Sequence, residues 1–303
     1  MLRVENLTKR FDTKTAVDHL NFQIKPGIIT GLLGPNGAGK TTTMRLITGF
    51  LEPTDGNITY KNESVFQNIS EFQSKLGYLP ESAPLYSDML VSEYLNYMAD
   101  IRGVDNHSKN QGISRVVDLC ELQTHLHFPI SLLSKGFRQR VALAGTLIHD
   151  PEVIILDEPT SGLDPNQISH IRTLIRNLGK DKTIILSTHI LKEVEDICDH
   201  AVIINNGSIV ADSKVSELYS GNRVLVTAKT DLAAMKSTFK DFEEPILSET
   251  EKEIDGFLPY LINPGEKSPE IVFQKLKSVK FEVREIKIYR QSLENVFEKL
   301  TRS

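Results

Sequence analysis

The spacing of hydrophobic and polar residues differs between parts of the chain. Up to about residue 33 the apolar side chains come in short runs that alternate with polar ones, which predicts strands over "LRVENL", "AVDHLNFQI" and "GIITGLL". The alternation is clearest at Val17, Leu20, Phe22 and Ile24. After turn residues at "EPTDG", the segment "NITYKN" predicts another short strand. We therefore expect the N-terminal part of the chain to be rich in β-structure.

Helical spacing replaces this alternation between Val91 and about Ile148. Apolar residues recur there at intervals of three and four, as at Tyr94, Leu95 and Met98, and strand signals disappear. This stretch, about residues 85–148 with its leading loop, is expected to form a helical subdomain.

Strands and helices alternate after the helical stretch. "PEVIILDEP" predicts a buried strand that ends in two carboxylates, residues Pro165 to Leu178 predict a helix, and "KTIILS" predicts another strand. Strands that alternate with helices favour a largely parallel sheet with helices on both faces. The expected fold class is α/β, with the helical subdomain inserted into a first domain of residues 1–220.

The pattern changes again around Tyr219 to Arg223. The remaining segments predict strand, helix, two strands, helix, strand and a final helix, from "RVLVTAK" to "SLENVFEKL". The two strands in the middle are expected to form a hairpin of "PILSETEKEI", residues 245–254, and "GFLPYLIN". The order βαββαβ is typical of a small ferredoxin-like α+β module, which we expect over residues 221–303. A chain of 303 residues has room for such a second domain.

Composition narrows the classes of function. The net charge of −5 and the pI near 5.9 argue against nucleic acid as the main partner, which usually requires a concentrated basic face. Cys120 and Cys198 lie in apolar helical patterns without metal or redox spacing, so we expect reduced core thiols. The sequence "MLRVENLTKRF" lacks the apolar region of a signal peptide, and no apolar run approaches the ~18 residues of a membrane span. Any work at a membrane is therefore expected to require a partner.

The segment "GLLGPNGAGKTTTMRLITG" has the spacing of a P-loop between a predicted strand and a predicted helix. Such a loop directs successive backbone N–H groups and the start of a helix at phosphate oxygens. Lys40 would neutralise the β- and γ-phosphates, and the Thr41 hydroxyl would bind the accompanying Mg²⁺. The alternative is an ordinary glycine-rich turn. The residues expected to bind the nucleotide phosphates are Gly34, Pro35, Asn36, Gly37, Ala38, Gly39, Lys40, Thr41 and Thr42.

Two further segments carry candidate chemistry. Asp157 and Glu158 end a buried strand, where open α/β sheets bind ligands, so the first would hold Mg²⁺ and the second would activate a water molecule. In "LLSKGFRQRVALAGTLI", Ser134 and Gly136 begin a predicted helix whose hydroxyl and free N–H groups suit an anion. Each has a plain structural alternative, strand-end polarity for the carboxylates and a helix cap for Ser134.

The ordered set of motifs resembles that of ABC ATPases over residues 1 to about 220. "LSKGFRQR" resembles the LSGGQ-type signature of this family and stands 23 residues before Asp157. "STH" places His189 as the switch histidine, which would contact the γ-phosphate, and "SGLD" places Asp164 in the D-loop, which communicates across the dimer. "GYLPE" places Glu81 in the Q-loop, and Phe11 falls where the family stacks an aromatic ring on adenine.

The resemblance implies an ATPase that binds ATP and Mg²⁺. The metal ligands would come from Thr41, Glu81 and Asp157, with Glu158 and His189 as catalytic residues. Glu81 departs from the usual glutamine and adds a negative charge near the triphosphate, and Phe11 replaces the usual tyrosine but keeps its stacking face.

The resemblance also implies a dimer that is closed by nucleotide. Ser134, Lys135 and Gly136 of one subunit would cover the ATP of the other, so two ATP molecules would be buried at a two-fold interface. The second subunit would be a second copy or a related ATPase. Because ATP would favour the closed form, hydrolysis would reopen the dimer.

Within the family, "YLPE", "LSKGFRQR" and the closing "RQSLENVFEKLTR" look like ATPase subunits of ABC-2-type exporters, most similar to gliding-motility-associated and multidrug-type members. Such a subunit would act at the cytoplasmic face of the cell membrane with a separate multi-span permease, through candidate docking residues Tyr86, Met89, Leu90 and Tyr97. For these four the alternative is burial in the subdomain core. The other classes of function are a soluble ABC ATPase that acts on ribosomes or DNA, and a nucleotide-sensing module without turnover. The intact Glu158 and His189 argue against the sensing module.

Overall fold

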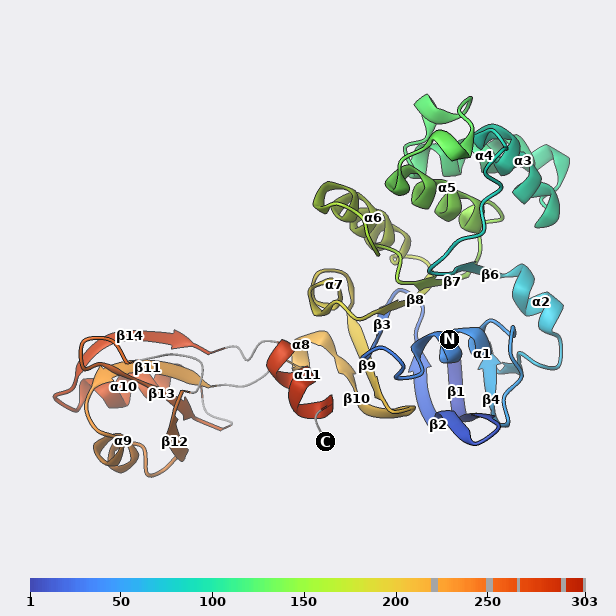
Figure 1. Ribbon diagram of the computed structural model, residues 1–303. Helices are drawn as coiled ribbons and strands as arrows, with labels where there is room; N and C mark the ends of the chain where they lie inside the picture. Colours follow the sequence, from blue (N-terminus) through green and yellow to red (C-terminus); the bar gives the residue numbers. More distant parts are fainter. Residues whose placement is uncertain (219–222, 249–252, 266–267, 290–292, 302–303) are drawn as a thin grey trace. The chain divides into compact units, whose positions relative to one another are not determined.

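The computed structural model describes residues 1–218, 223–248, 253–265, 268–289 and 293–301 (Figure 1). The chain divides into two compact units, one of residues 1–215 together with the end of the chain from Phe297, and one of residues 216–296. Among the described helices, none is both long enough and apolar enough to cross a membrane.

A six-stranded sheet forms the centre of the first unit as far as it is described, in the order β10-β9-β3-β8-β7-β6. Its strands are β3 (Ile29–Leu33), β6 (Leu76–Leu79), β7 (Val153–Asp157), β8 (Thr183–Thr188), β9 (His200–Asn205) and β10 (Ser208–Lys214). The neighbours from β9 to β6 are parallel, and β10 pairs antiparallel at the edge. Every residue of β3, β7 and β8 is buried, as expected for strands covered on both faces.

An antiparallel sheet packs against this centre. It has the order β2-β1-β4-β5 and consists of β1 (Leu2–Phe11), β2 (Lys14–Ile24), β4 (Asp55–Tyr60) and β5 (Glu63–Ser64). One apolar core joins it to helix α1 (Lys40–Ile47) and to the parallel strands. Val17 and Leu20 are both buried although three residues apart, because the strand bulges at His19, whose φ is +49°.

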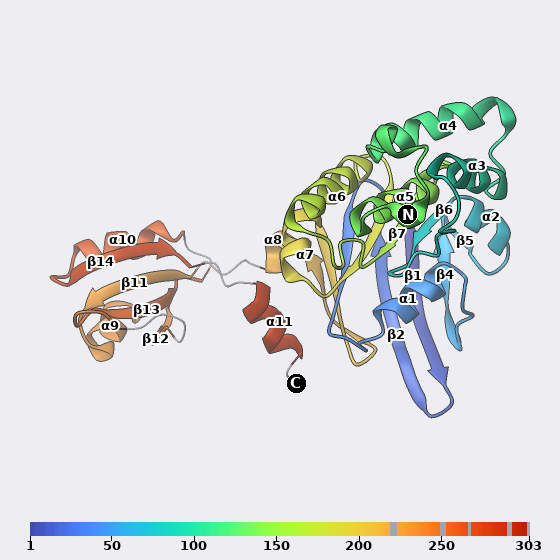
Figure 2. The same ribbon diagram turned by 45° about the horizontal axis from the view of Figure 1, so that its top comes forward.

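The predicted helical subdomain consists of three main helices, seen together in Figure 2. They are α3 (Val91–Ile101), α4 (Asn106–Leu119) and α5 (Lys135–Leu147), with short 3-10 turns at Gln123–His125 and Ile130–Leu132. Asp105 caps α4 and Ser134 caps α5, each by accepting backbone N–H groups. Helices α2 (Ile69–Ser74), α6 (Pro165–Leu178) and α7 (Leu191–Ile197) also belong to this unit.

The second unit has the predicted order of strands and helices. Its elements are β11 (Val224–Lys229), α9 (Leu232–Thr238), β12 (Glu243–Leu247), β13 (Leu258–Asn263), α10 (Glu270–Lys277) and β14 (Glu282–Ile288). The sheet order β12-β13-β11-β14 is that of a ferredoxin-like module, and both helices bury their apolar residues on the same face of it. Short helix α8 (Val215–Leu218) precedes it, and α11 (Leu293–Thr301) follows.

The structure bears out the expected fold class and corrects one element. The sequence predicts a strand over residues 245–254, but β12 ends at Leu247, and residues 249–252 lie outside the described residues. Cys120 and Cys198 are free and buried, in agreement with the expectation of core thiols.

Candidate functional site

The P-loop connects β3 to α1, and its backbone just before α1 has a conformation that only glycine tolerates. Gly39 has φ +108°, and a Cβ atom there would lie 2.5 Å from the carbonyl oxygen of Ala16. Gly39 therefore lets the loop pass close to β2 and start α1. Asn36 and Gly37 are exposed at its tip, so their backbone groups are accessible to a ligand.

Lys40 is a buried cation that has only carbonyl partners among its described hydrogen bonds. Its ammonium donates to the carbonyl oxygens of Gly34, at 2.8 Å, and Pro35, at 3.2 Å, and the residue is 7% exposed. Burial lowers the pKa of Lys40, while the charges of Glu158, Asp157 and Glu81 counteract this effect. A buried ammonium inside a loop of backbone groups fits an anionic group such as a triphosphate.

Asp157 lies at the end of β7, next to Ser187 on the parallel neighbour β8. The Ser187 hydroxyl donates a hydrogen bond to the Asp157 carboxylate, which is 2% exposed. The sheet therefore holds this carboxylate in a fixed orientation. Thr41, on the first turn of α1, is exposed.

Glu158 leaves the strand in an unusual conformation. Its φ is +48°, in the left-handed region, and its N–H donates to the carbonyl oxygen of Ser187 at 3.1 Å. Its carboxylate accepts from the Nδ1 atom of His189 at 2.9 Å. Burial raises the pKa of Glu158, which the hydrogen bond and charge of His189 partly offset. The pair thus contains a carboxylate whose pKa is moved toward neutral pH, a property typical of catalytic sites.

Glu193 is a functional candidate that the motifs did not identify. Its carboxylate is fully buried on α7 and accepts hydroxyl hydrogen bonds from Thr160, just after Glu158, and Thr188, just before His189. Thr188 in turn accepts from the Ile190 N–H at 3.0 Å. One carboxylate therefore joins the two segments that carry the Glu158–His189 pair. In the sequence it is merely one of several acidic residues in "LKEVEDI".

The signature residues form a second group at the start of α5. Ser134 is exposed and caps the helix through the N–H of Phe137, at 3.4 Å. A Cβ atom on Gly136 would lie 2.3 Å from the side chain of Gln167, so this helix start lies against α6. Lys135 reaches Gly162, which precedes Asp164. Among the described contacts, no hydrogen bond or ion pair joins these residues to the P-loop.

The remaining predicted residues lie at the periphery. Phe11, at the end of β1, is 44% exposed, with the ammonium of Lys9 at 5.3 Å from its ring centre. Asp164 caps α6 by accepting the N–H groups of Asn166 and Gln167, both at 3.0 Å. Glu81 is exposed on the loop after β6, near enough to Lys40 to affect its pKa.

Three comparisons with known proteins agree with the motifs. A family model described as ABC transporter matches residues 17–161. The bacitracin transport ATP-binding protein BcrA of Bacillus licheniformis is 39% identical over 225 residues, which cover 74% of this chain and 72% of that protein. BcrA of Enterococcus faecalis is 33% identical over 299 residues, 91% of this chain and 96% of that protein.

The fold also agrees with solved structures. The structure of cbiO1 from Clostridium perfringens, part of the ABC transporter complex cbiONQ, superposes with a TM-score of 0.66 at 29% identity, covering 72% of this chain and 90% of that one. The family resemblance inferred from the motifs is thus confirmed. The parallel sheet leads into a P-loop, and BcrA of Enterococcus faecalis is similar along nearly the whole length of both chains. The chain therefore belongs to the ATP-binding subunits of ABC transporters, which are ATPases.

Proposed function

We propose that this chain is the ATP-hydrolysing motor of an ABC exporter, and that its site residues act as their motif positions suggest. The observation that carries the proposal is the Glu158–His189 pair next to Lys40 and Asp157. In this arrangement Glu158 takes a proton from the attacking water molecule, while His189 orients the carboxylate and faces the γ-phosphate. Lys40 neutralises charge on the phosphates.

Mg²⁺ fits the donors that the site provides. The residues that would hold the ion are Thr41, Asp157 and Glu81, whose carboxylate replaces the amide of the usual glutamine. All three offer the oxygen ligands that this ion prefers. No group of three His, Cys, Asp or Glu residues in the described ranges forms a ready metal site. This suits an ion that is bound largely by phosphate oxygens and water. When bound, the ion would neutralise negative charge on the phosphates.

We further propose that two copies close around two ATP molecules. The exposed cap residue Ser134, with Lys135 and Gly136, offers an anion site that is separate from the P-loop. A head-to-tail pair would bring this helix start to the nucleotide of the partner, with Asp164 near the interface.

A groove between the P-loop core and the helical subdomain suits a permease. It has a volume of about 600 Å³ and is lined by side chains that include Phe50, Tyr86, Tyr97 and Ile101. Phe50 is 76% exposed and Tyr86 50%. The tyrosine rings lie edge to face at 5.2 Å, with their hydroxyl oxygens 3.4 Å apart. Exposed apolar and aromatic groups gathered in a groove favour docking of a partner.

The groove refines the docking residues that the sequence suggested. Tyr86 is exposed, Tyr97 is half-buried, and both line the groove. Met89 and Leu90 are half-buried as well, but they are not among the residues that line it. None of the four belongs to the fully buried core. Pro80, next to Glu81, lines the groove as well. A coupling segment of a membrane permease seated here would therefore contact the loop that carries Glu81. The chain would then work as a peripheral subunit at the cytoplasmic face of the membrane, and export rather than uptake follows the ABC-2-type motifs.

The experiment is to introduce charge into the groove. In Tyr86→Asp and Phe50→Asp variants, ATPase activity of the isolated chain should persist, while recruitment to membranes that contain the permease and transport are lost. Phe128→Asp is the matched control, because Phe128 is similarly exposed, at 48%, and does not line the groove. Full transport by both groove variants would contradict the docking surface. ATPase activity that responds to ribosomes or DNA, and not to a permease, would favour the soluble class.

A further inference from the structure

The ferredoxin-like unit has one sheet edge that is suited to pairing with another chain. β14 is a terminal strand of its sheet, and no strand of the described ranges lies along its outer side. Unpaired edges present backbone donors and acceptors to a further strand. The opposite edge, β12, is shorter, contains Pro245 and shifts register between Glu243 and Ile246, so it is a poorer template.

The register of β14 identifies which backbone groups point outward. Ile288 on β14 faces Val224 on β11. The N–H of Tyr289, the residue after Ile288, donates to the carbonyl oxygen of Arg223, the residue before Val224, at 2.8 Å. That pair is therefore of the non-hydrogen-bonded type, and the types alternate along an antiparallel ladder. Lys287 consequently directs its backbone groups to β11, whereas Ile286 and Ile288 direct theirs to the free edge.

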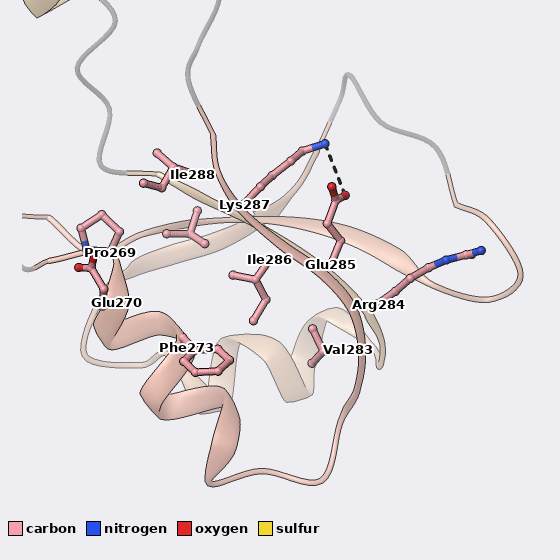
Figure 3. A pocket seen from close by; sticks show the side chains of 10 residues that line it. Pro269, Glu270, Phe273, Val283, Arg284, Glu285, Ile286, Lys287 and Ile288 are labelled. Carbon is pink, nitrogen blue, oxygen red and sulfur yellow. Dashed lines mark ion pairs between the residues drawn. The ribbon is translucent and has the colours of Figure 1, made fainter.

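The side chains of β14 separate into an apolar face and a charged face. Figure 3 shows Ile286 and Val283 on the side of α10, near Phe273, and Glu285 and Lys287 on the other side, joined by an ion pair of 3.4 Å. The apolar side borders a groove of about 570 Å³. Ile288 and Phe273 remain 57% and 47% exposed there.

We propose that β14 is the interface through which two copies of this chain join their C-terminal units. A two-fold axis at Ile286 pairs this residue with its own copy through the outward backbone groups. The same axis places Glu285 of each copy opposite Lys287 of the other, on the charged face, so that the two sheets continue into one. The exposed apolar residues Ile288 and Phe273 lie on the face that this pairing extends.

The charge sequence favours this register and this partner. An axis at Ile288, whose backbone groups also point outward, would set Lys287 opposite Tyr289, so the two copies would form no Glu285–Lys287 pairs. An axis at Arg284, Glu285 or Lys287 would set each residue against an identical charge, which destabilises a cross-strand pair. An axis at Val283 lies beyond the register shift between β14 and β11, where the strand is irregular. The strand is thus complementary to itself, as a two-fold contact between identical chains requires.

Charge variants of the full chain test this interface in the absence of nucleotide. Sedimentation velocity should show that the unmodified chain self-associates and that Glu285→Lys or Lys287→Glu weakens self-association by roughly tenfold, since each variant creates two like-charge pairs. An equimolar mixture of the two variants should associate again as a mixed dimer, identified by native mass spectrometry with one variant isotopically labelled. Lys240→Glu, an exposed charge change in the same unit, is the control.

The mixture separates the interface from local effects. Both partners in it lack the intrachain Glu285–Lys287 pair, so restored association reports only contacts between copies. Any of three results would overturn the proposal. The unmodified chain could be monomeric at every concentration, or the single variants could associate as well as the unmodified chain. The third such result is a mixture that associates no better than either variant alone. The ATP-dependent dimer is measured separately with Glu158→Gln, so either proposal fails on its own.

Discussion

The Nδ1 atom of His189 faces both carboxylate oxygens of Glu158, at 2.9 and 3.0 Å. The side chain of Glu158 is 10% exposed and that of His189 is 50% exposed. The carboxylate is therefore nearly enclosed, whereas half of the imidazole surface is accessible to a ligand. Because Nδ1 must donate to an ionised carboxylate, this contact also selects the tautomer of a neutral ring.

This contact predicts how the pH dependence of hydrolysis will change. Burial raises the pKa of Glu158, and His189 opposes that increase. A base acts when ionised, so activity should rise with pH through the pKa of Glu158, at a pH above the ordinary glutamate value of 4.5. In His189→Ala the acidic limb should move to still higher pH, and His189→Asn, which keeps a donor, should restore part of the shift. Single-turnover rates across pH measure this, and an unmoved limb in His189→Ala would contradict it.

Replacing Glu158 by glutamine should separate binding from hydrolysis. The amide keeps the size of the side chain and cannot accept a proton, so hydrolysis should fall by ~10²–10⁴, the range for loss of a general base. ATP would still close the dimer, which should accumulate and be visible by size-exclusion chromatography with light scattering. Normal turnover would remove Glu158 from the mechanism, while absence of an ATP-dependent dimer would count against the proposed sandwich.

Lys40→Ala should distinguish the phosphate site from the base site. Lys40 is the buried cation of the loop, whereas Phe11 is the ring assigned to adenine, so the variant should lose affinity for ATP and retain that for adenosine. Loss of a charge-assisted hydrogen bond worth about 1.5–3 kcal/mol corresponds to roughly 10–100-fold weaker ATP binding. Calorimetry with both ligands gives the comparison, with Phe11→Ala as the reciprocal variant. Equal losses for ATP and adenosine would show that the two sites are misassigned.

Glu193→Gln should lower kcat more than it changes KM. An amide accepts through one oxygen only, so either Thr160 or Thr188 loses its acceptor, at a cost of about 1–3 kcal/mol for a buried group. We expect kcat to fall about tenfold, because the segments on either side of the Glu158–His189 pair lose their common anchor. Glu195→Gln on the same helix is the control, since Glu195 pairs with Lys192 at the surface. If Glu193→Gln lowers the melting temperature alone, with kcat intact in the folded protein, Glu193 has no positioning role.

Most of the core fold could be predicted because its signals are local. The spacing of Gly34, Gly39 and Lys40 indicates the strand, loop and helix around them, and helix α6 begins at Pro165 and ends at Leu178 as its pattern predicts. Both rest on residues that are neighbours in sequence, where periodicity and capping operate.

Features that depend on distant residues could not be predicted in the same way. Glu193 and Thr160 are 33 positions apart and meet only after β7 and β8 pair. The bulge at His19 is another case, because a backbone with φ +49° leaves no regular period in the sequence. The outward direction of the Ile286 backbone follows from the register between β14 and β11, which no single segment encodes.

Because both thiols are buried, the two cysteines of the unmodified chain should not react with thiol-labelling reagents. Alkylating reagents attack the thiolate, and burial raises the pKa of Cys120 to about 12 and that of Cys198 further still. A maleimide or nitroxide reagent should therefore leave the folded protein unmodified near neutral pH. Cysteines introduced together at Tyr86 and Lys240 would carry the only labels, so a dye pair can follow nucleotide-driven motion without first removing the native cysteines.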